Sequence, residues 1–467
     1  MQNVDVAVIG MGPGGEHVAG PLADQGLRVL GIDSGLVGGE CPYWGCVPTK
    51  MMVRAGDALA EARRVPQLAG STGTVQADWS TVASRIRTEA TDTWTDQVAV
   101  DRFTAKGGIF VRGSGRILGP HCVEVSGSRY STGRGIVVST GSRPAVPPIP
   151  GLAAVDFWTN HEFVQAEALP SSLIILGGGA IGCEIGQVAA RFGVRVTLVE
   201  AADRLLPADE PEAGRILADV FATEGIEVHL GSGATSVSRA RDDFEVTLAS
   251  GGVVSAERLL VATGRRVDLS AVGLETVGVP ADSRFAPIDE RCRVADGVWA
   301  VGDVTGKGAF THVAMYQADI VVRDVLGKEV AGASYHALPR VTFTQPEVGS
   351  VGLTEAQARE TLSSIRVGVA RVPETARGWM HQVGNQGVIK VIEDSERGVL
   401  VGACAMGPSG GEVLGALAVA VHAAIPVSSL TSMMYAYPTF HRGIEDALRS
   451  LSPIGDEASP GSEGATS

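Results

Sequence analysis

Two stretches of this chain repeat one order of apolar and polar positions. Each opens with a short, largely apolar run, 5–9 or 172–176, that has the length of one strand. A glycine-rich turn and a mixed segment of helical length follow, and a second apolar run, 29–32 or 194–199, completes the unit. The pattern predicts two strand–helix–strand units with parallel strands.

The turn after the first strand has the spacing Gly-x-Gly-x-x-Gly in both units, and an acidic residue ends the second strand. In both units the acid lies 23 residues after the first glycine, close to the spacing of about 20 expected of a ribose-binding carboxylate. The glycines allow backbone amides to approach a pyrophosphate at a helix N-terminus. One copy would be a weak signal, but two complete copies predict two dinucleotide-binding sites. The residues are Gly10, Gly12, Gly15 and Asp33 in the first unit and Gly177, Gly179, Gly182 and Glu200 in the second.

Three further strands end in glycine-containing turns, which follow the apolar runs 136–138, 259–261 and 298–301. A glycine at the end of a buried strand lets the backbone come close to a ligand. We expect these turns to line the cofactor sites, although ordinary strand-to-loop turns explain each of them equally well. The candidate residues are Thr140, Gly141, Gly264, Gly302 and Asp303.

After residue 335 the pattern changes to short strands and two helices. The proline-rich segment 144–150 is interpreted as a linker. Residues 452–467, rich in Ser, Pro, Gly and acidic residues, predict a disordered tail. The expected elements are strands at 340–344, 388–392 and 400–405 and helices at 413–424 and about 439–451.

Length and composition narrow the classes of function. A chain of 467 residues exceeds one ordinary domain, and a prior of about 150 residues per domain suggests three. The net charge of −14 argues against nucleic acid or an anionic membrane as a partner. No apolar run approaches roughly 18 residues, and the chain enters a strand at once, without a basic and apolar leader. We therefore expect a cytoplasmic globular protein.

The segment Cys41-Pro-Tyr-Trp-Gly-Cys46 carries the most informative chemistry. Pro48 predicts a helix that begins just before it, which leaves Cys46 at the helix N-terminus, where a thiolate is favoured. Lys50 then lies one turn later on the same face. A bridge to Cys41 needs Cα atoms within roughly 7 Å, and the intervening proline and glycine make a fold-back easier. The pair is interpreted as a redox disulfide; two unpaired structural cysteines are the alternative.

The other four cysteines lie in apolar or strand-like surroundings, which predict buried free thiols. No second Cys/His pair near Cys41 and Cys46 completes a zinc site, so we expect no metal. These four residues are Cys122, Cys183, Cys292 and Cys404.

Taken together, the segments resemble the flavin- and pyridine-nucleotide-dependent disulfide reductases, the family of dihydrolipoamide dehydrogenase, glutathione reductase and mercuric reductase. The likeness covers residues 4 to about 451 and is most specific at 38–50, with support from 302–303 and 341–355. It implies an α/β fold with two Rossmann-type, doubly wound domains and a C-terminal α+β dimerisation domain, hence a homodimer. The implied domains are an FAD domain at 1–150 and 270–334, an NAD(P) domain at 151–269 and a dimerisation domain at 335–451.

The resemblance also implies roles for individual residues. Cys46 is the thiolate against the flavin, Cys41 attacks the substrate, and Lys50 with Glu184 forms a pair near the flavin. A solvated helix residue is the alternative for Glu184. The first glycine loop, Asp33 and Asp303 hold FAD, whereas the second loop and Glu200 hold the nicotinamide nucleotide. Because a carboxylate accepts the 2′-hydroxyl and repels a 2′-phosphate, Glu200 predicts that NADH is favoured over NADPH, although Arg195 and Arg204 are near enough in sequence to offset this repulsion.

One motif departs from the disulfide-reducing members, which carry His-Pro-Thr near the C-terminus as the acid/base. Here Tyr437 replaces the histidine and Arg442 replaces the acid five residues later. A tyrosine with a pKa near 10 is a poor base at neutral pH. His441 could substitute, but its i,i+4 spacing to Glu445 is interpreted as a surface ion pair.

The predicted function is an FAD-dependent NAD(P)H oxidoreductase with a working Cys41–Cys46 disulfide and a small acceptor, a disulfide or another compound. Three alternatives stay open: a diaphorase or quinone reductase with an idle disulfide, an enzyme like mercuric reductase without its C-terminal cysteine pair, and a flavin-bearing protein that binds a partner without turnover.

Overall fold

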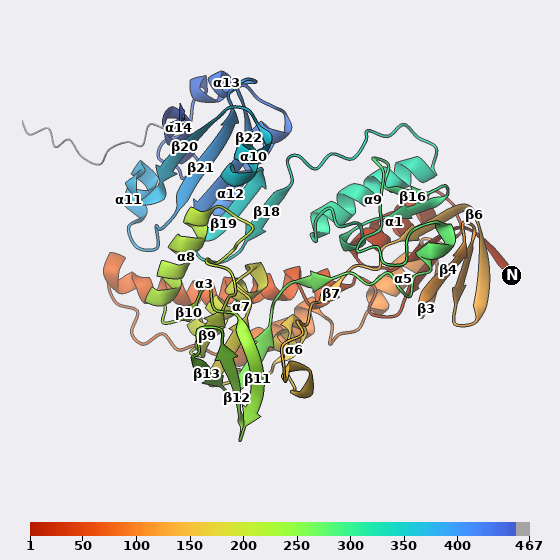
Figure 1. The fold of residues 1–467 in the computed structure, drawn as a ribbon, viewed down its shortest axis with the longest axis horizontal. Coiled ribbons are helices and arrows are strands. Elements are labelled where there is room, and N and C mark those ends of the chain that lie inside the picture. Colours follow the sequence, from red (N-terminus) through yellow and green to blue (C-terminus); the bar gives the residue numbers. More distant parts are fainter. Residues whose placement is uncertain (454–467) are drawn as a thin grey trace, which may run out of the picture.

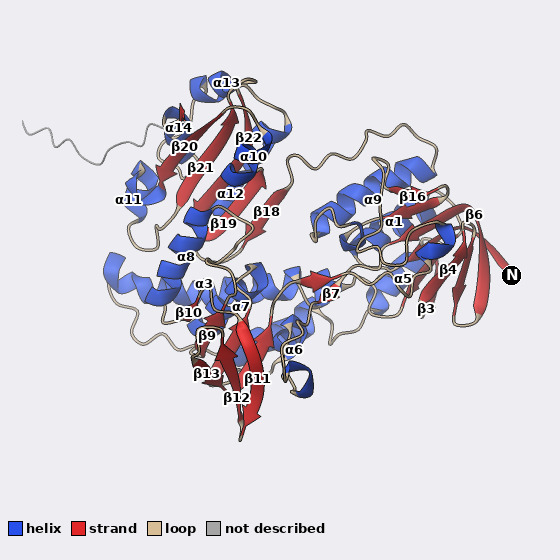
Figure 2. Cartoon of the chain, in the orientation of Figure 1, coloured by secondary structure: helices blue, strands red, loops and turns tan. Residues whose placement is uncertain are grey.

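The computed structural model of the protein describes residues 1–453 and contains three main sheets, each the centre of one unit (Figure 1). The first sheet, whose central strands are parallel, the parallel second sheet and the antiparallel C-terminal sheet, together with the helices packed on them (Figure 2), confirm the predicted α/β fold class. Among the described residues, no helix is both long and apolar enough to span a membrane.

The first unit is an eight-stranded sheet made from two separate parts of the chain. Its central order is β16-β17-β6-β1-β2-β3, and the strands from β17 to β3 run parallel. Helices α1, α5 and α9 pack on one face through apolar residues such as Val18, Phe103 and Val321. The strands are β1 (Gln2–Ile9), β2 (Val29–Asp33), β3 (Ile109–Arg112), β4 (Gly115–Gly119), β5 (Cys122–Val125), β6 (Ser128–Val138), β16 (Arg293–Ala295) and β17 (Val298–Ala300). The helices are α1 (Pro13–Asp24), α5 (Gln97–Ala105), η3 (Leu274–Val277), η4 (Asp303–Thr305) and α9 (Thr311–Val325). Helix α4 (Trp79–Arg85) and the π-helix η1 (Ile86–Ala90) precede α5 in the sequence but pack in the core of the second unit.

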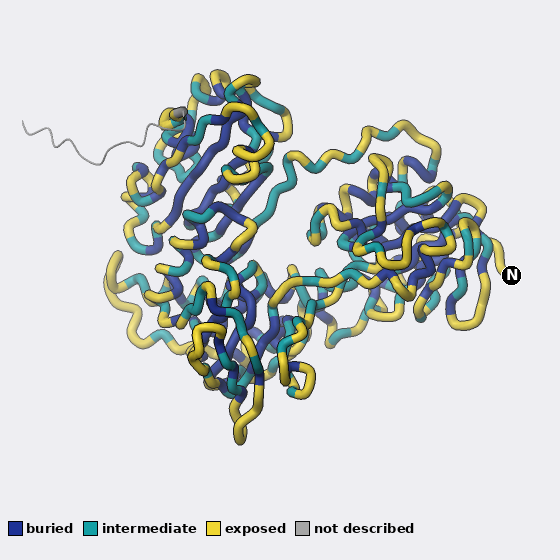
Figure 3. Tube along the Cα trace, viewed as in Figure 1, coloured by how far each residue is buried: buried dark blue, intermediate teal, exposed yellow. Residues whose placement is uncertain are grey.

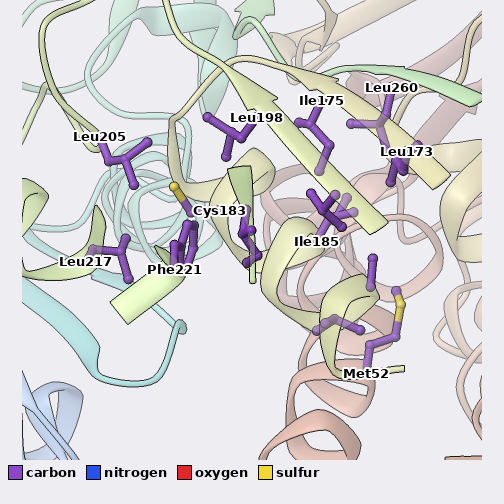
Figure 4. Packing of buried hydrophobic residues seen from close by; sticks show 14 of the residues in the cluster. Met52, Leu173, Ile175, Cys183, Ile185, Leu198, Leu205, Leu217, Phe221 and Leu260 are labelled. Carbon is purple, nitrogen blue, oxygen red and sulfur yellow. The ribbon is translucent and has the colours of Figure 1, made fainter. Parts of the chain in front are cut away.

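The second unit is a parallel sheet in the order β10-β9-β8-β14, with a three-stranded antiparallel sheet β11-β12-β13 beside it. Figure 4 shows its core, where Cys183 and Ile185 of α7 face Leu198 and Ile175 of the sheet. The elements are η2 (Leu152–Ala154), α6 (Asn160–Gln165), β8 (Ser172–Leu176), α7 (Ala180–Arg191), β9 (Arg195–Val199), α8 (Pro211–Thr223), β10 (Glu227–His229), β11 (Ala234–Ala240), β12 (Asp243–Leu248), β13 (Val253–Ala256) and β14 (Arg258–Val261).

The C-terminal unit is an antiparallel sheet in the order β18-β19-β22-β21-β20-β23. The last helix is shorter than predicted, because Phe440 to Gly443 form a hydrogen-bonded turn before it. The predicted tail starts at 452, but β23 includes its first two residues; 454–467 lie outside the described residues. The elements are β18 (Pro339–Thr342), β19 (Glu347–Gly352), α10 (Glu355–Thr361), β20 (Ile365–Arg371), η5 (Val372–Glu374), α11 (Ala376–His381), β21 (Val388–Asp394), β22 (Val399–Gly407), α12 (Gly410–His422), α13 (Val427–Ser432), α14 (Gly443–Arg449) and β23 (Ser452–Pro453).

The connections between the units include a long helix and a small two-stranded sheet. Helix α2 (Glu40–Tyr43) leads into α3 (Cys46–Leu68), which runs between the second and C-terminal units (Figure 1). The two crossings between the first and second units pair as a small sheet, β7 (Arg143–Pro144) with β15 (Arg265–Arg266), so the predicted linker at 144–150 begins inside it. Figure 3 shows that the sheet centres are buried and the connections exposed.

Three of the four predicted buried thiols are buried, namely Cys183, Cys292 and Cys404. Cys122 is only half-buried, contrary to the prediction. In β5 the burial alternates with the strand period, and Cys122 shares the outer face with Glu124.

Candidate active site

The first glycine-rich loop joins β1 to α1 and requires glycine at two of its three positions. Gly10 has a φ of +94°, and a side chain there would overlap the carbonyl of Ser139. A Cβ on Gly15 would overlap the carbonyl of Gly10, so α1 packs closely on the strand only without a side chain. A Cβ on Gly12 would have no neighbour nearer than 3.9 Å. The backbone at Gly12 is therefore open to a ligand at the N-terminus of α1.

The second loop, between β8 and α7, repeats this arrangement. Gly177 has a φ of +111° and lies against the carbonyl of Ala262, and Gly182 lies against the carbonyl of Gly177. A Cβ on Gly179 would meet no atom within 4 Å. Each loop thus combines two glycines that the turn requires with one that leaves open space, which is the shape that fits a bound pyrophosphate.

The acids at the strand ends hold the two loops in the same way. Both carboxylate oxygens accept backbone amides, and free lone pairs remain for a ribose hydroxyl. Burial raises the pKa of Asp33 despite these two hydrogen bonds. The donors are Met11 and Gly35 for Asp33, at 2.6 and 2.7 Å, and Gly178 and Ala202 for Glu200, at 2.6 and 2.7 Å.

The remaining cofactor candidates lie where the crossing segments meet the first sheet. Gly141 and Gly264 have φ values of +66° and +113°, with open space where a Cβ would stand, and Thr140 is exposed. Gly302, with a φ of +82°, leads into Asp303 at the start of η4. The carboxylate of Asp303 lies 3.7 Å from the guanidinium of Arg265, which the sequence analysis did not single out.

The two cysteines of the CxxxxC segment are brought together by a fold-back of the chain. The amides of Trp44 and Gly45 both donate to the carbonyl of Glu40, at 2.8 and 2.7 Å, which closes a tight turn after α2. Helix α3 then begins at Cys46, with Gly45 as its N-cap, as the position of Pro48 predicted. Cys41 is half-buried and Cys46 is exposed.

The thiols of Cys41 and Cys46 differ strongly in acidity. A hydrogen bond from Cys41, together with Thr311 and the charge of Lys50, lowers the pKa of Cys46 to about 6. The Oγ1 of Thr311, the first residue of α9, lies 3.6 Å from the sulfur of Cys46. The same hydrogen bond and burial raise the pKa of Cys41. At neutral pH the pair therefore holds one proton on Cys41, with Cys46 as thiolate.

Lys50 and Glu184 form an ion pair between α3 and α7. Lys50 Nζ donates to Glu184 at 2.8 Å and lies 4.6 Å from the ring centre of Phe343. Glu184 is only 4% exposed and also accepts the amide of Phe343 at 2.8 Å. Glu184 is therefore a paired, buried carboxylate, and the solvated alternative is wrong.

The C-terminal candidates have partners within their own unit. Tyr437 is 65% exposed, and the guanidinium of Arg442 lies 5.5 Å from its ring centre. The predicted ion pair of His441 with Glu445 is wrong: α14 begins only at Gly443, and Glu445 pairs instead with Arg442 at 3.2 Å. A second arginine, Arg449, contacts the same carboxylate at 2.8 Å, and His441 lies near the ring of Tyr435.

Two residues beside the cysteines were missed by the sequence analysis. Glu40 Oε1 lies 2.6 Å from Nε2 of His161, and the ring of His161 stacks on that of Trp44. Glu40 was visible as the residue before Cys41. His161 had no local signal, because 121 positions separate it from Glu40.

Comparisons with known proteins agree on one family. Residues 4–318 match the family model described as pyridine nucleotide-disulphide oxidoreductase, and residues 338–448 match its dimerisation domain. A dihydrolipoyl dehydrogenase of Thermus scotoductus is 32% identical over 97% of this chain and 98% of its own length. A mercuric reductase of Streptomyces lividans is 32% identical over 96% of both chains.

Solved structures give the same result. LpdA from Mycobacterium tuberculosis aligns with a TM-score of 0.83 at 25% identity, over 96% of this chain and 99% of that one. The HOCl-induced flavoprotein disulfide reductase RclA from Escherichia coli, solved as a Cu(II) complex, aligns with a TM-score of 0.84 at 25% identity, again over 96% and 99%.

Proposed function

Because the chain belongs to the pyridine nucleotide-disulphide oxidoreductase family, whose members are FAD-dependent enzymes that use NAD(P)H, we propose that it passes electrons from NAD(P)H through FAD and a redox-active Cys41–Cys46 pair to a small acceptor. The observation that carries this proposal is the turn at residues 40–45, which brings the thiols of Cys41 and Cys46 together at the start of α3, where the pKa of Cys46 is lowered and that of Cys41 is raised. Such a pair has the asymmetry that a redox dithiol needs.

We assign the two cofactors to the two glycine loops. FAD takes the loop of Gly10 with Asp33 and Asp303, in a domain at 1–150 and 270–334. The nicotinamide nucleotide takes the loop of Gly177 with Glu200, in a domain at 151–269. The matched open space at the second glycine of each loop supports both assignments. When bound, FAD supplies the two-electron chemistry that links nicotinamide to a disulfide.

The residues around the cysteines have distinct tasks in this proposal. Two electrons and one proton convert the Cys41–Cys46 disulfide into a Cys41 thiol and a Cys46 thiolate. Lys50 stabilises the thiolate by charge, which makes Cys46 the better leaving group. Glu184, held by the amide of Phe343, fixes the position of Lys50. Cys41 is then the sulfur that meets the acceptor.

We also propose that NADH is the preferred donor. Glu200 stands where a 2′-phosphate would be placed, and its charge repels it. Of the two arginines near Glu200 in the sequence, Arg195 begins β9 and so lies at the other end of the strand, which leaves Arg204 as the cation that could offset this repulsion. It is tied instead to Asp203 at 3.2 Å and to the carbonyl of Pro207 at 3.0 Å.

The match to the dimerisation domain at residues 338–448 indicates a homodimer. We propose that this domain spans 335–451 and that the enzyme works in the cytoplasm, where reducing conditions keep the remaining cysteines as thiols.

The acceptor has two candidate classes. A disulfide, or a soft metal ion as in the names of the mercuric reductase relatives, would meet Cys41. A quinone or dye would take electrons from the flavin without the cysteines, which is the alternative function, a quinone reductase with an idle disulfide. The replacement of the usual histidine by the exposed Tyr437 is the observation that favours this alternative.

A stopped-flow acceptor screen that compares the wild type with Cys41→Ser tests the proposal. Disulfide or metal reduction that is abolished in Cys41→Ser, with NADH oxidation by quinones retained, supports a working dithiol. Equal rates of both enzymes with every acceptor class would show that the disulfide is idle and would leave the quinone reductase as the function.

A further inference from the structure

Cys41 needs a base that removes its proton, and none of the residues assigned a task so far provides one. Cys41 must lose this proton before its sulfur can attack an acceptor, because the thiolate is the nucleophile. Its pKa is raised by the hydrogen bond to Cys46 and by burial, so water at neutral pH removes the proton poorly. A positioned base beside Cys41 would remove this barrier.

The imidazole of His161 contacts the turn that carries Cys41 at a residue before the cysteine and at a residue after it. Before the cysteine, Glu40 Oε1 lies 2.6 Å from Nε2 of His161. After it, the ring of Trp44 stacks on that of His161, with centres 4.5 Å apart and planes 10° from parallel. The side-chain amide of Asn160 donates to the carbonyl of Trp44 at 2.8 Å and fixes the same pair of segments.

This arrangement has the geometry of an oriented acid/base. One ring nitrogen of His161 is held by a carboxylate, which leaves the other nitrogen to exchange protons. The side chains of His161 and Glu40 are 31% and 34% exposed, so the dyad can reach solvent or a substrate. Trp94 stacks on Trp44 at 5.9 Å and further fixes the turn.

The charges that face the imidazole are of both signs. Glu40 contacts it, and Glu162 follows it on α6 and is bonded to Thr159. Of the cations, Arg265 approaches Glu40 at 3.3 Å, and Lys50 lies near the cysteine pair. The hydrogen bond from His161 and the charge of Arg265 outweigh burial and lower the pKa of Glu40, which keeps it a carboxylate.

We propose that His161, oriented by Glu40, is the proton carrier for Cys41, a role that rests on the proposed dithiol function. With a small disulfide as acceptor, His161 takes the proton of Cys41, and the Cys41 sulfur attacks the acceptor to form a mixed disulfide. The first leaving thiolate takes the proton back from the imidazolium. The Cys46 thiolate then attacks the Cys41 sulfur, which re-forms the Cys41–Cys46 disulfide and releases a second thiolate that is protonated by solvent. The dithiol loses two electrons, and the acceptor gains them.

With His161 as the base, the enzyme does not need a histidine at position 437 of the C-terminal motif. The base is supplied by the same chain that carries the cysteines, so Tyr437 need not act as one. His441 has no carboxylate partner among the described residues, since Glu445 is engaged by two arginines.

The test uses the holoenzyme reduced with one equivalent of NADH and mixed with 4,4′-dithiodipyridine, an aromatic disulfide whose thiopyridone product is coloured. We expect the wild-type rate constant to rise with pH along a limb that His161→Gln abolishes, with a loss on the order of 10²-fold at neutral pH. In Glu40→Gln the shape of the pH profile should change as well, because the imidazole loses the carboxylate that orients it. A purely structural role of the dyad would leave the shape of the profile unchanged.

His17→Gln is the matched control, because His17 forms a similar pair with Asp319, at 2.8 Å, away from the cysteines. Its profile should equal that of the wild type. An unchanged pH limb in both His161→Gln and Glu40→Gln would overturn the proposal, as would a limb that disappears only in His441→Phe. Cys41→Ser separates the two levels through the amount released, because the exposed Cys46 thiolate alone can release one thiopyridone, whereas the dithiol releases two. If Cys41→Ser still loses two equivalents, the dithiol function itself fails. A second equivalent that needs Cys41 but not His161 refutes only the proton carrier.

Discussion

At the scale of single residues, position decides chemistry more than residue type does. Two identical side chains, Cys41 and Cys46, lie close together, yet one keeps its proton and the other releases it. The difference comes first from the hydrogen bond between them, which lowers the pKa of Cys46 and raises that of Cys41. Thr311, Lys50 and the backbone at the start of α3 lower the pKa of Cys46 further. The helix start and Lys50 were predictable from Pro48 and from spacing along the chain. Thr311 and His161 were not, because they arrive from remote parts of the sequence.

The choice of donor is a prediction at this scale. Glu200→Ala should reduce the ratio of kcat/KM for NADH over NADPH by about tenfold or more, since a repulsion of about 1.4 kcal/mol is enough for that factor. Steady-state kinetics with both nucleotides measure the ratio. A wild-type enzyme that already prefers NADPH would contradict the role given to Glu200.

At the scale of elements, the two strand–helix–strand units were predicted because local pattern suffices to define them. The strands 172–176 and 259–261 and the helix through Ala190 were placed within about a residue or two of their observed ends. The last helix was drawn too long, because its first turn is replaced by the turn ending at Gly443. That turn also removed the expected contact between His441 and Glu445.

The two kinds of glycine in a loop should respond differently to substitution. Gly182→Ala places a Cβ against the carbonyl of Gly177, so it should lower the Tm and weaken NADH binding together. Gly179→Ala fills only open space, so the Tm should stay within error while the Kd for NADH rises about tenfold, or about 1.4 kcal/mol. Thermal melts and NADH titrations of the FAD-loaded enzyme compare the two. Unaltered NADH affinity in Gly179→Ala would exclude the pyrophosphate from this loop.

At the scale of the whole molecule, the second and C-terminal units behave as one packed body. Val348, Val388 and Met406 of the C-terminal sheet belong to the same apolar core as α7. The fully buried Lys390 crosses this contact and donates to Glu210 at 2.7 Å. These partners are 180 positions apart, so no local pattern could reveal them. The sequence predicts the units and the chemistry of each, but the contacts between them can be identified only from the three-dimensional structure.

The buried lysine gives a prediction for this scale. Lys390→Met should lower the free energy of unfolding by about 3–5 kcal/mol, because it leaves several carboxylates without their cation. Lys106→Met, which breaks an exposed pair with Asp24, should cost about 1 kcal/mol or less. Urea unfolding of both variants provides the comparison. Equal stability would mean that the network does not join the units.

The most direct test of the account is the long-wavelength absorbance band of the two-electron-reduced enzyme, which reports a thiolate in contact with the flavin. Because the pKa of Cys46 is lowered to about 6, the band should grow as the pH rises through about 6 and stay constant above it. It should be lost in Cys46→Ser and retained in Cys41→Ser. A band that is absent from the wild type at every pH, or that survives in Cys46→Ser, would contradict the central claim that Cys46 is the thiolate at the flavin.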